Sequence, residues 1–359
     1  MNRSLGLCPL LLTLAIAQVG QTAGASTQEE DIAVLKEQVN ELNSRLDEGM
    51  TISGYVDTEY SVNNKKGGDA NGIRIHHLSL FFEKRVTEKW RFFSEIEYED
   101  GPLFDDKKTT EGKIYAEAVN LSYLWRSDVN LRGGRFFTPA GIWNIDHYPP
   151  FVPTQERPLH VRNIFPQIFD GAMVYGTRPV AANTFLKYDL YLGNGEGNTG
   201  KNDGNREKAV GLNAGLLLPF LKHTEVGLTY YRDTLNNGTD KTAIGTHAKV
   251  KAGSFAFQGE YASGNHKPTT GSDFVNTGYY AQFMYNISHW TLGMRHSAYD
   301  KNSATDAIDN KEVANSVFVN YHINHALVLK LEHHRHSYDD AKKDPFRSTM
   351  VSVVAYLGS

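Results

Sequence analysis

The sequence is nearly free of cysteine and of long hydrophobic runs. Its one cysteine, Cys8, lies within the first 25 residues, so the rest of the chain cannot form a disulfide. Beyond those residues no stretch is long and apolar enough for a membrane helix. An exported chain that has neither disulfides nor membrane helices can instead be stabilised by a closed β-barrel, in which every backbone donor and acceptor is paired around the ring.

The motifs of common enzymes are also absent. The sequence contains no G-x-S-x-G, H-E-x-x-H, Walker or dinucleotide-binding pattern. The adjacent residues His296 and Ser297 would point to opposite faces of a strand, which excludes them as a hydrolytic pair. Acidic and basic residues are nearly balanced, at 41 and 37, and no basic tract favours nucleic acid. We therefore expect no enzyme activity, no cofactor and no nucleic-acid partner.

Residues 1–25 have the pattern of a secretory signal peptide. Arg3 precedes an apolar run over 5–17, and Ala23-Gly24-Ala25 is a cleavage site of the A-x-A kind. Cys8 precedes that run and follows a leucine, which disfavours lipidation. We place the start of the mature chain near Ser26.

Residues 26–49 differ from everything that follows, because their apolar residues recur three and four positions apart. Charged residues fill the positions between them, as they do beside a heptad stripe. We interpret the segment as a short periplasmic coiled coil that favours oligomers; the alternative is one amphipathic helix packed against the barrel. The stripe consists of Ile32, Leu35, Val39, Leu42 and Leu46.

From residue 50 to 359 the apolar pattern has a period of two, which predicts an all-β transmembrane antiparallel barrel of about sixteen strands. Short connections alternate with long ones, as periplasmic turns alternate with external loops in outer-membrane barrels. A soluble sandwich is the alternative, although it gives no reason for this alternation. The expected strands are 50–62, 72–84, 89–99, 113–125, 129–138, 169–177, 184–192, 208–217, 223–232, 242–252, 254–262, 277–286, 289–299, 312–321, 326–336 and 346–357.

The alternation also assigns the two faces of each strand. In 184–192, Leu190 and Leu192 would meet lipid, whereas Asp189 and Tyr191 would face the lumen. Tryptophan and tyrosine residues gather near the strand ends, where membrane barrels carry aromatic girdles.

The longest connection, 139–168, follows the fifth expected strand. Its prolines fix the backbone and remove donors, so the loop is stiff and cannot be a strand. Long ordered loops are commonly functional, and we expect this one to fold into the lumen and constrict the pore. The alternatives are an external cap and an oligomer contact. The prolines are Pro139, Pro149, Pro150, Pro153, Pro158 and Pro166.

Basic residues in this loop, and on expected lumen faces, are the candidate solute contacts. Guanidinium groups fixed at a constriction favour anions. Nearby acidic residues such as Asp146 and Glu156 leave a second interpretation open, in which these groups only form ion pairs within the loop. The predicted anion-contacting set is Arg135, Arg157, His160, Arg162, Lys187, Arg295 and Lys330.

The run 333–336 contains three histidines, of which His334 and His336 would share a strand face. Spacing fixes no third ligand beside them. We expect this cluster to belong to a polar lumen and rim, and we expect no metal site.

The segment 133–141, Gly-Gly-Arg-Phe-Phe-Thr-Pro-Ala-Gly, is similar to the strand-to-loop motif of the phosphate-selective porin O and P family of Gram-negative outer membranes. The signal, the helical segment 26–49 and the first strand, with Ile-Ser-Gly-Tyr at 52–55, resemble that family too. The resemblance covers nearly the whole mature chain in layout and is specific around 129–177. It implies a sixteen-stranded barrel, a homotrimer and an inward-folded third loop.

The chain departs from this family at two places. Its last aromatic residue, Tyr356, is followed by three more residues, whereas family barrels commonly end on an aromatic. The third loop has only Arg157 and Arg162 where the family has an arginine-rich loop. Arg135 matches the motif, but phosphate specificity is not carried over.

These patterns predict an outer-membrane porin that lets small hydrophilic solutes diffuse passively, either as a general porin or with a weak preference for phosphate-like anions. One alternative is a substrate-specific uptake channel for organic acids or sugars, which inward tyrosines such as Tyr191, Tyr280 and Tyr299 would favour. Another is a non-conducting adhesive or structural barrel.

Overall fold

The computed structural model describes residues 49–67, 71–101, 112–218, 224–303, 311–340 and 342–358. The expected signal peptide, and all but the last residue of the expected coiled coil, lie outside the described residues. No helix in the described part is long and apolar enough to cross a membrane.

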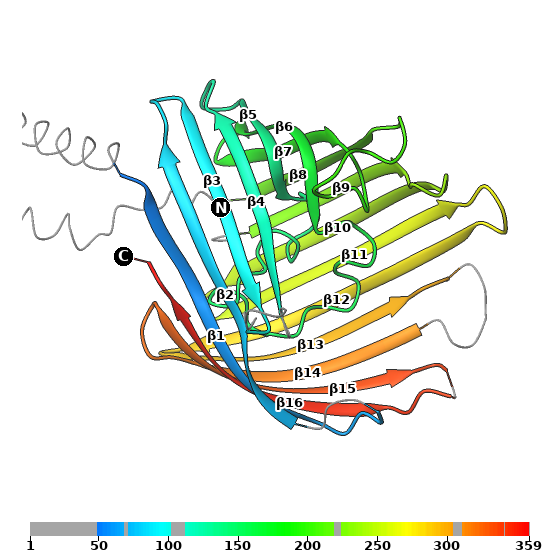
Figure 1. The fold of residues 1–359 in the computed structure, drawn as a ribbon. Helices are drawn as coiled ribbons and strands as arrows, with labels where there is room; N and C mark the ends of the chain where they lie inside the picture. Colours follow the sequence, from blue (N-terminus) through cyan, green and yellow to red (C-terminus); the bar gives the residue numbers. More distant parts are fainter. Residues whose placement is uncertain are drawn as a thin grey trace, which may run out of the picture.

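Sixteen antiparallel strands form one closed barrel, in which each strand pairs with its neighbours in the sequence and β16 closes on β1 (Figure 1). This confirms the predicted all-β class and the predicted strand number. The strands are β1 Thr51–Asn63, β2 Asn71–Arg85, β3 Trp90–Glu99, β4 Lys113–Tyr123, β5 Asn130–Phe137, β6 Ile168–Ala181, β7 Thr184–Gly193, β8 Ala209–Leu218, β9 Thr224–Thr234, β10 Asp240–Ala252, β11 Phe255–Lys267, β12 Phe274–Ile287, β13 Trp290–Asp300, β14 Lys311–His322, β15 Leu327–Tyr338 and β16 Phe346–Tyr356.

The connections alternate in length, but less regularly than the sequence predicts. Residues in the left-handed region, such as Asn183 and Ser288, make tight turns at one end of the barrel. At the other end, however, the connection 235–239 is no longer than the turn 124–129. The reason is that β9 and β10 remain paired as far as Thr234 and Asp240.

Exposure along the strands confirms the predicted faces. Leu190 and Leu192 are 54% and 55% exposed, whereas Asp189 and Tyr191 beside them are 9% and 1% exposed. The barrel therefore carries its apolar side chains outward and its charged side chains inward, as expected when lipid rather than water surrounds the sheet.

Three register shifts interrupt this alternation, and two of them add a polar residue to the lumen wall. In β2 the register shifts so that Asp57 pairs with His77 and the next residue of β1 pairs with Ile75, which leaves His76 as the extra residue. In β4 a second shift leaves Glu117 as the extra residue. A bulge turns two consecutive side chains toward one face, so it delivers a polar group to the lumen that strict alternation would place outside.

Candidate functional site

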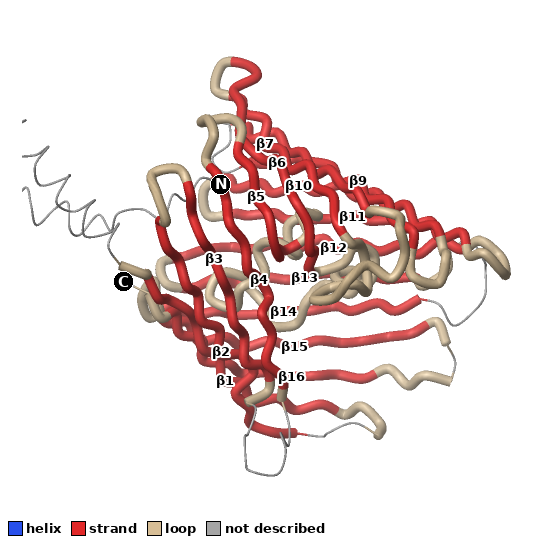
Figure 2. Tube along the Cα trace, turned by 45° about the horizontal axis from the view of Figure 1, so that its top comes forward, coloured by secondary structure: helices blue, strands red, loops and turns tan. Residues whose placement is uncertain are grey.

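The connection between β5 and β6, residues 138–167, lies inside the barrel and is hydrogen-bonded to the opposite wall (Figure 2). The Trp143 N–H donates to Glu260 Oε1 on β11 at 2.9 Å, and the Gln155 N–H donates to Glu332 Oε1 on β15 at 2.7 Å. Hydrogen bonds to charged groups are among the stronger ones. The loop is thus tied across the lumen by carboxylates of the wall.

Two cations of the wall bind the same loop. Arg295 donates from Nη1 to Thr154 Oγ1 at 2.6 Å and from Nη2 to the Glu156 carbonyl at 2.8 Å. Lys330 Nζ donates to two loop carbonyls at 2.6 and 2.7 Å. Each of these cations is 2% exposed. They face inward as predicted, but the loop covers them, so they anchor it and leave no surface for a passing anion.

His160, the predicted contact near the middle of the loop, is also an anchor. Its ring stacks on Tyr280 with 5.8 Å between centroids, and its Nε2 lies 3.7 Å from Glu260 Oε2. The inner wall makes room at Gly278, where an added Cβ would overlap the His160 side chain. His160 is 3% exposed, which keeps it away from solutes.

Glu156 connects the loop to the histidines of β15. His336 lies between Glu156 and Glu312, with Nε2 3.2 Å from Glu156 Oε1 and Nδ1 3.0 Å from Glu312 Oε1. Burial acts to raise the pKa of Glu156, but the hydrogen bond from His336 and the nearby histidine and arginine charges lower it overall. His334 has its nitrogens on Ser316 and Glu332. The ring nitrogens of this cluster are therefore used to fasten the loop.

An apolar cluster fills the lumen between the loop and the inner wall of β5–β11. It is built from buried aromatic and small side chains that pack on both ends of the loop. Its members are Phe136, Ala140, Ile164, Phe165, Phe169, Met173, Tyr191, Ala209, Tyr231, Ala243 and Ala262. Burial of this kind contributes about 25 cal/mol for each Å² of apolar surface removed from water. This side of the lumen is packed like a protein core.

A polar cavity of about 190 Å³ lies on the other side of the loop, against β2 and β3. The wall contributes His76, His77 and Glu99. The loop contributes Arg157 and Arg162, together with uncharged side chains. Of the predicted anion contacts, these two arginines are brought together in one place.

The wall behind the cavity is acidic. Glu95, Glu97 and the bulge residue Glu117 are all buried, and Tyr148 of the loop donates its hydroxyl to Glu95 Oε2 at 3.1 Å. Basic groups on the loop thus face carboxylates on the wall. Burial and the nearby positive charge of Arg162 lower the pKa of Arg157 to about 10, so Arg157 stays cationic at neutral pH.

His147, next to Tyr148 in the loop, is 3% exposed, and neither ring nitrogen has a hydrogen-bond partner among the described residues, although Nε2 lies 3.7 Å from Glu117 Oε2. Burial and the charge of Arg157 lower the pKa of His147 to about 3. The unfolded chain binds this proton below about pH 6.5. Stability from the neutral imidazole is therefore lost as pH falls from about 6.5 toward 3, by about 1.4 kcal/mol per pH unit.

We expect the H147Q variant to lose less thermal stability than the natural chain between pH 7 and pH 4, because glutamine binds no proton. Melting followed by circular dichroism at the two pH values checks this. H333Q is the control, because His333 lies on the exposed outer face of β15. Equal acid sensitivity of H147Q and the natural chain would show that protonation of His147 does not cause the loss of stability in acid.

The prediction for Arg135 is wrong, because this residue lies on the outer face. Its register partner on β4 is Val119, which is 41% exposed. Its guanidinium forms a bidentate pair with Asp170 of β6, at 2.8 and 3.0 Å. The neighbouring Phe136 faces inward and is 2% exposed. Two glycines precede Arg135, and without side chains they give no alternation from which its face could be predicted.

Lys187 faces the lumen from β7, where it pairs with Thr177 and Gly215. It does not line the cavity that contains the loop arginines.

The sequence analysis missed the polar residues that line the wall of β1 and β2. Asp57 and Glu59 are two positions apart on the lumen face, and their exposures are 0% and 1%. The spacing of two positions in the sequence is a signal that could have predicted that both side chains share the lumen face. His76 and Glu117 carry no such signal, because bulges place them.

Comparisons with known proteins bear on the fold of the chain. No family model matches the chain. A protein of Aquifex aeolicus (strain VF5), described as uncharacterized, is 34% identical over 149 residues, which are 41% of this chain and 32% of that protein. The chain thus spans about a third of the length of this curated relative.

Solved porins share the fold. The anion-selective porin from Comamonas acidovorans matches with a TM-score of 0.64 and 15% identity over 86% of this chain and 99% of that one. OmpF of Salmonella typhi, in complex with daunomycin, gives 0.62 and 8% over 86% and 97%. OprB of Pseudomonas putida gives 0.58 and 11% over 89% and 97%. At these identities the likeness defines the class of fold, a sixteen-stranded barrel of the kind found in porins.

Proposed function

We propose that the chain is an outer-membrane porin through which small hydrophilic solutes diffuse passively, with a preference for anions and without enzymatic activity. The observation that carries this proposal is the loop fixed across the lumen, which holds Arg157 and Arg162 at a polar cavity. Fixed cationic groups at a narrow point of a water-filled channel favour anions. The anion-selective porin among the neighbours is consistent with this preference.

The outer surface supports a place in a lipid bilayer. Leu329 and Leu331 of β15 pair with Val353 and Val351 of β16, and all four are between 39% and 49% exposed. Water would disfavour so continuous an apolar surface. At the short-turn end, tryptophan–tyrosine pairs stack across neighbouring strands, as expected for an aromatic girdle.

The proposal also covers the N-terminal segments and the oligomeric state. Residues 1–25 would direct export, and residues 26–49 would form a periplasmic coiled coil beside a homotrimer of barrels. The layout resembles that of the phosphate-selective porin O and P family, and the proposal does not include phosphate specificity. Tyr191 and Tyr280 are buried under the loop, at 1% and 2% exposure, so they do not favour the substrate-specific alternative.

Conductance of the purified protein in a planar bilayer tests this function. We expect conductance in steps of three, and a reversal potential in a salt gradient that favours anions. The R135Q variant is a matched control, because it removes a cation from the outer face and should leave the reversal potential unchanged. Folded barrels that conduct no current would contradict the proposal and favour an adhesive or structural barrel.

A further inference from the structure

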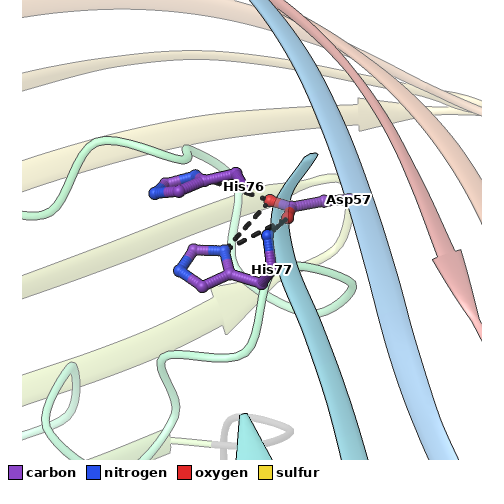
Figure 3. A group of neighbouring side chains, drawn as sticks. All are labelled: Asp57, His76 and His77. Atoms are coloured by element: carbon purple, nitrogen blue, oxygen red, sulfur yellow. Dashed lines mark hydrogen bonds and ion pairs between the residues drawn. The ribbon is translucent and has the colours of Figure 1, made fainter. Parts of the chain in front are cut away.

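Three side chains of β1 and β2 converge on the lumen side of the barrel wall, as Figure 3 shows for Asp57, His76 and His77. His77 Nδ1 lies 3.1 and 3.3 Å from the two Asp57 carboxylate oxygens, and His76 Nδ1 lies 3.8 Å from Asp57 Oδ2. One nitrogen from each ring and one carboxylate oxygen all fall within 4.8 Å of one another. The bulge makes this possible, because it turns two consecutive histidines toward the same face.

A fourth possible ligand atom lies beside this group. Glu59 Oε2 is 3.3 Å from His76 Nδ1. Glu59 is 1% exposed, and this oxygen has no hydrogen-bond partner within the described residues; neither has His76 Nδ1. Buried polar atoms are normally satisfied, so such a pair marks a place where a further group belongs.

Neighbouring groups hold the two carboxylates in place. The His77 backbone N–H donates to Asp57 Oδ1 at 2.6 Å. Arg74 donates from Nε to Glu59 Oε1 at 2.9 Å, which turns the other oxygen of Glu59 toward His76. Hydrogen bonds of this kind fix the orientation of metal ligands and raise affinity.

We propose that Asp57, His76 and His77, with Glu59 as a fourth ligand, bind a divalent transition-metal ion of the Zn²⁺ class in the wall of the barrel. Two imidazole nitrogens with carboxylate oxygens are a donor set that Zn²⁺, Ni²⁺ and Cu²⁺ accept. Mg²⁺ and Ca²⁺ prefer oxygen ligands alone, so they fit this set poorly. The ion would replace the contacts that the imidazoles now make with the carboxylates.

The site is reachable and is distinct from the histidines of β15. His76 and His77 line the cavity that also contains Arg157 and Arg162, so an ion arriving through the lumen meets them directly. On β15, which is separated from β1 only by β16, both nitrogens of His336 already lie beside carboxylates of Glu156 and Glu312. Binding at the β1–β2 site adds positive charge to a wall that is otherwise acidic, and thereby strengthens the anion preference; this last effect alone rests on the proposed function.

Calorimetric titration of the untagged, refolded, chelator-treated protein with Zn²⁺ tests the site. We expect one Zn²⁺ per chain, and an affinity reduced on the order of a hundredfold in the double variant H76N/H77N. H296N/H333N is the matched control, since it removes two exposed histidines from the outer faces of β13 and β15 and should keep the affinity. Heat-modifiable migration on a gel confirms that each variant is folded. D57N is a further variant, which removes the carboxylate ligand of Asp57 and keeps both imidazoles.

Co²⁺ supplies a readout of geometry that does not depend on channel activity. The natural chain should give the visible absorption of a four-coordinate cobalt site, and H76N/H77N should lose it. The proposal is overturned if Zn²⁺ binds H76N/H77N as well as it binds the natural chain, if H296N/H333N loses the ion instead, or if no Zn²⁺ binds. Each of these results leaves the conductance test of the porin intact.

Discussion

Replacing Arg157 and Arg162 together by glutamate should reverse the ion preference of the channel from anions to cations. Both residues line the cavity between the loop and the wall, which Glu99 of β3 also lines. Replacing two positive charges by two negative ones makes this cavity acidic. Coulomb energies of about 1 kcal/mol per pair of charges roughly 4 Å apart in water imply a change on the order of tenfold in the ratio of anion to cation permeability. Reversal potentials in a salt gradient measure it.

A variant of Lys187 is the control for R157E/R162E. It faces the lumen from β7 but lies outside the cavity, so K187E should shift the reversal potential much less than R157E/R162E. Equal shifts would mean that the net charge of the lumen, rather than the loop, sets the preference. An unchanged reversal potential in R157E/R162E would refute the role of the loop arginines.

Replacing Arg295 by methionine should release the loop and give a larger, noisier conductance. Arg295 donates to Thr154 and to the Glu156 carbonyl, and its guanidinium lies 5.6 Å from the centre of the Trp143 ring. Methionine fills much of the space but leaves Thr154 and the Glu156 carbonyl without the two hydrogen bonds from Arg295. Hydrogen bonds to charged groups contribute about 1.5–3 kcal/mol each. The loop should therefore leave its docked position while the barrel, closed by its backbone hydrogen bonds, remains folded.

Conductance histograms and limited proteolysis within 138–167 check this outcome. Arg347 serves as the control, because it lies on the outer face of β16, and R347M should leave both measurements unchanged. If R295M keeps the natural conductance and the natural resistance to protease, the carboxylate contacts of the loop backbone suffice to hold it without this arginine.

The barrel itself was predictable from the sequence, because lipid-facing strands impose a period of two on their residues, except at bulges. Leu190 and Leu192 identify the outer face of β7, and Asp189 and Tyr191 identify its inner face. The strand order then follows from antiparallel pairing of neighbours in the chain. Strand number and face assignment depend on this one repeated rule.

The site was less predictable, because it depends on departures from that rule. The two glycines before Arg135 leave no alternating side chains from which its face could be predicted. Bulges turn His76 and Glu117 toward the lumen. The basic residues Arg295 and Lys330 face inward as expected, but their partners are loop backbone atoms more than a hundred residues away in sequence. Alternation gives the face of a side chain; it does not give what lies opposite across the lumen.

The hydrogen bonds of the loop to β15 have a consequence for the order of assembly. They join positions 177 and 181 residues apart, and β15 is the last strand but one. Contacts of such sequence separation are slow to form, because the intervening chain must be ordered first. The loop cannot reach its final anchors until almost every strand is in place. We therefore expect the passage to acquire its final width in a late step, after the sheet has closed, and nascent barrels to be transiently leakier than mature ones.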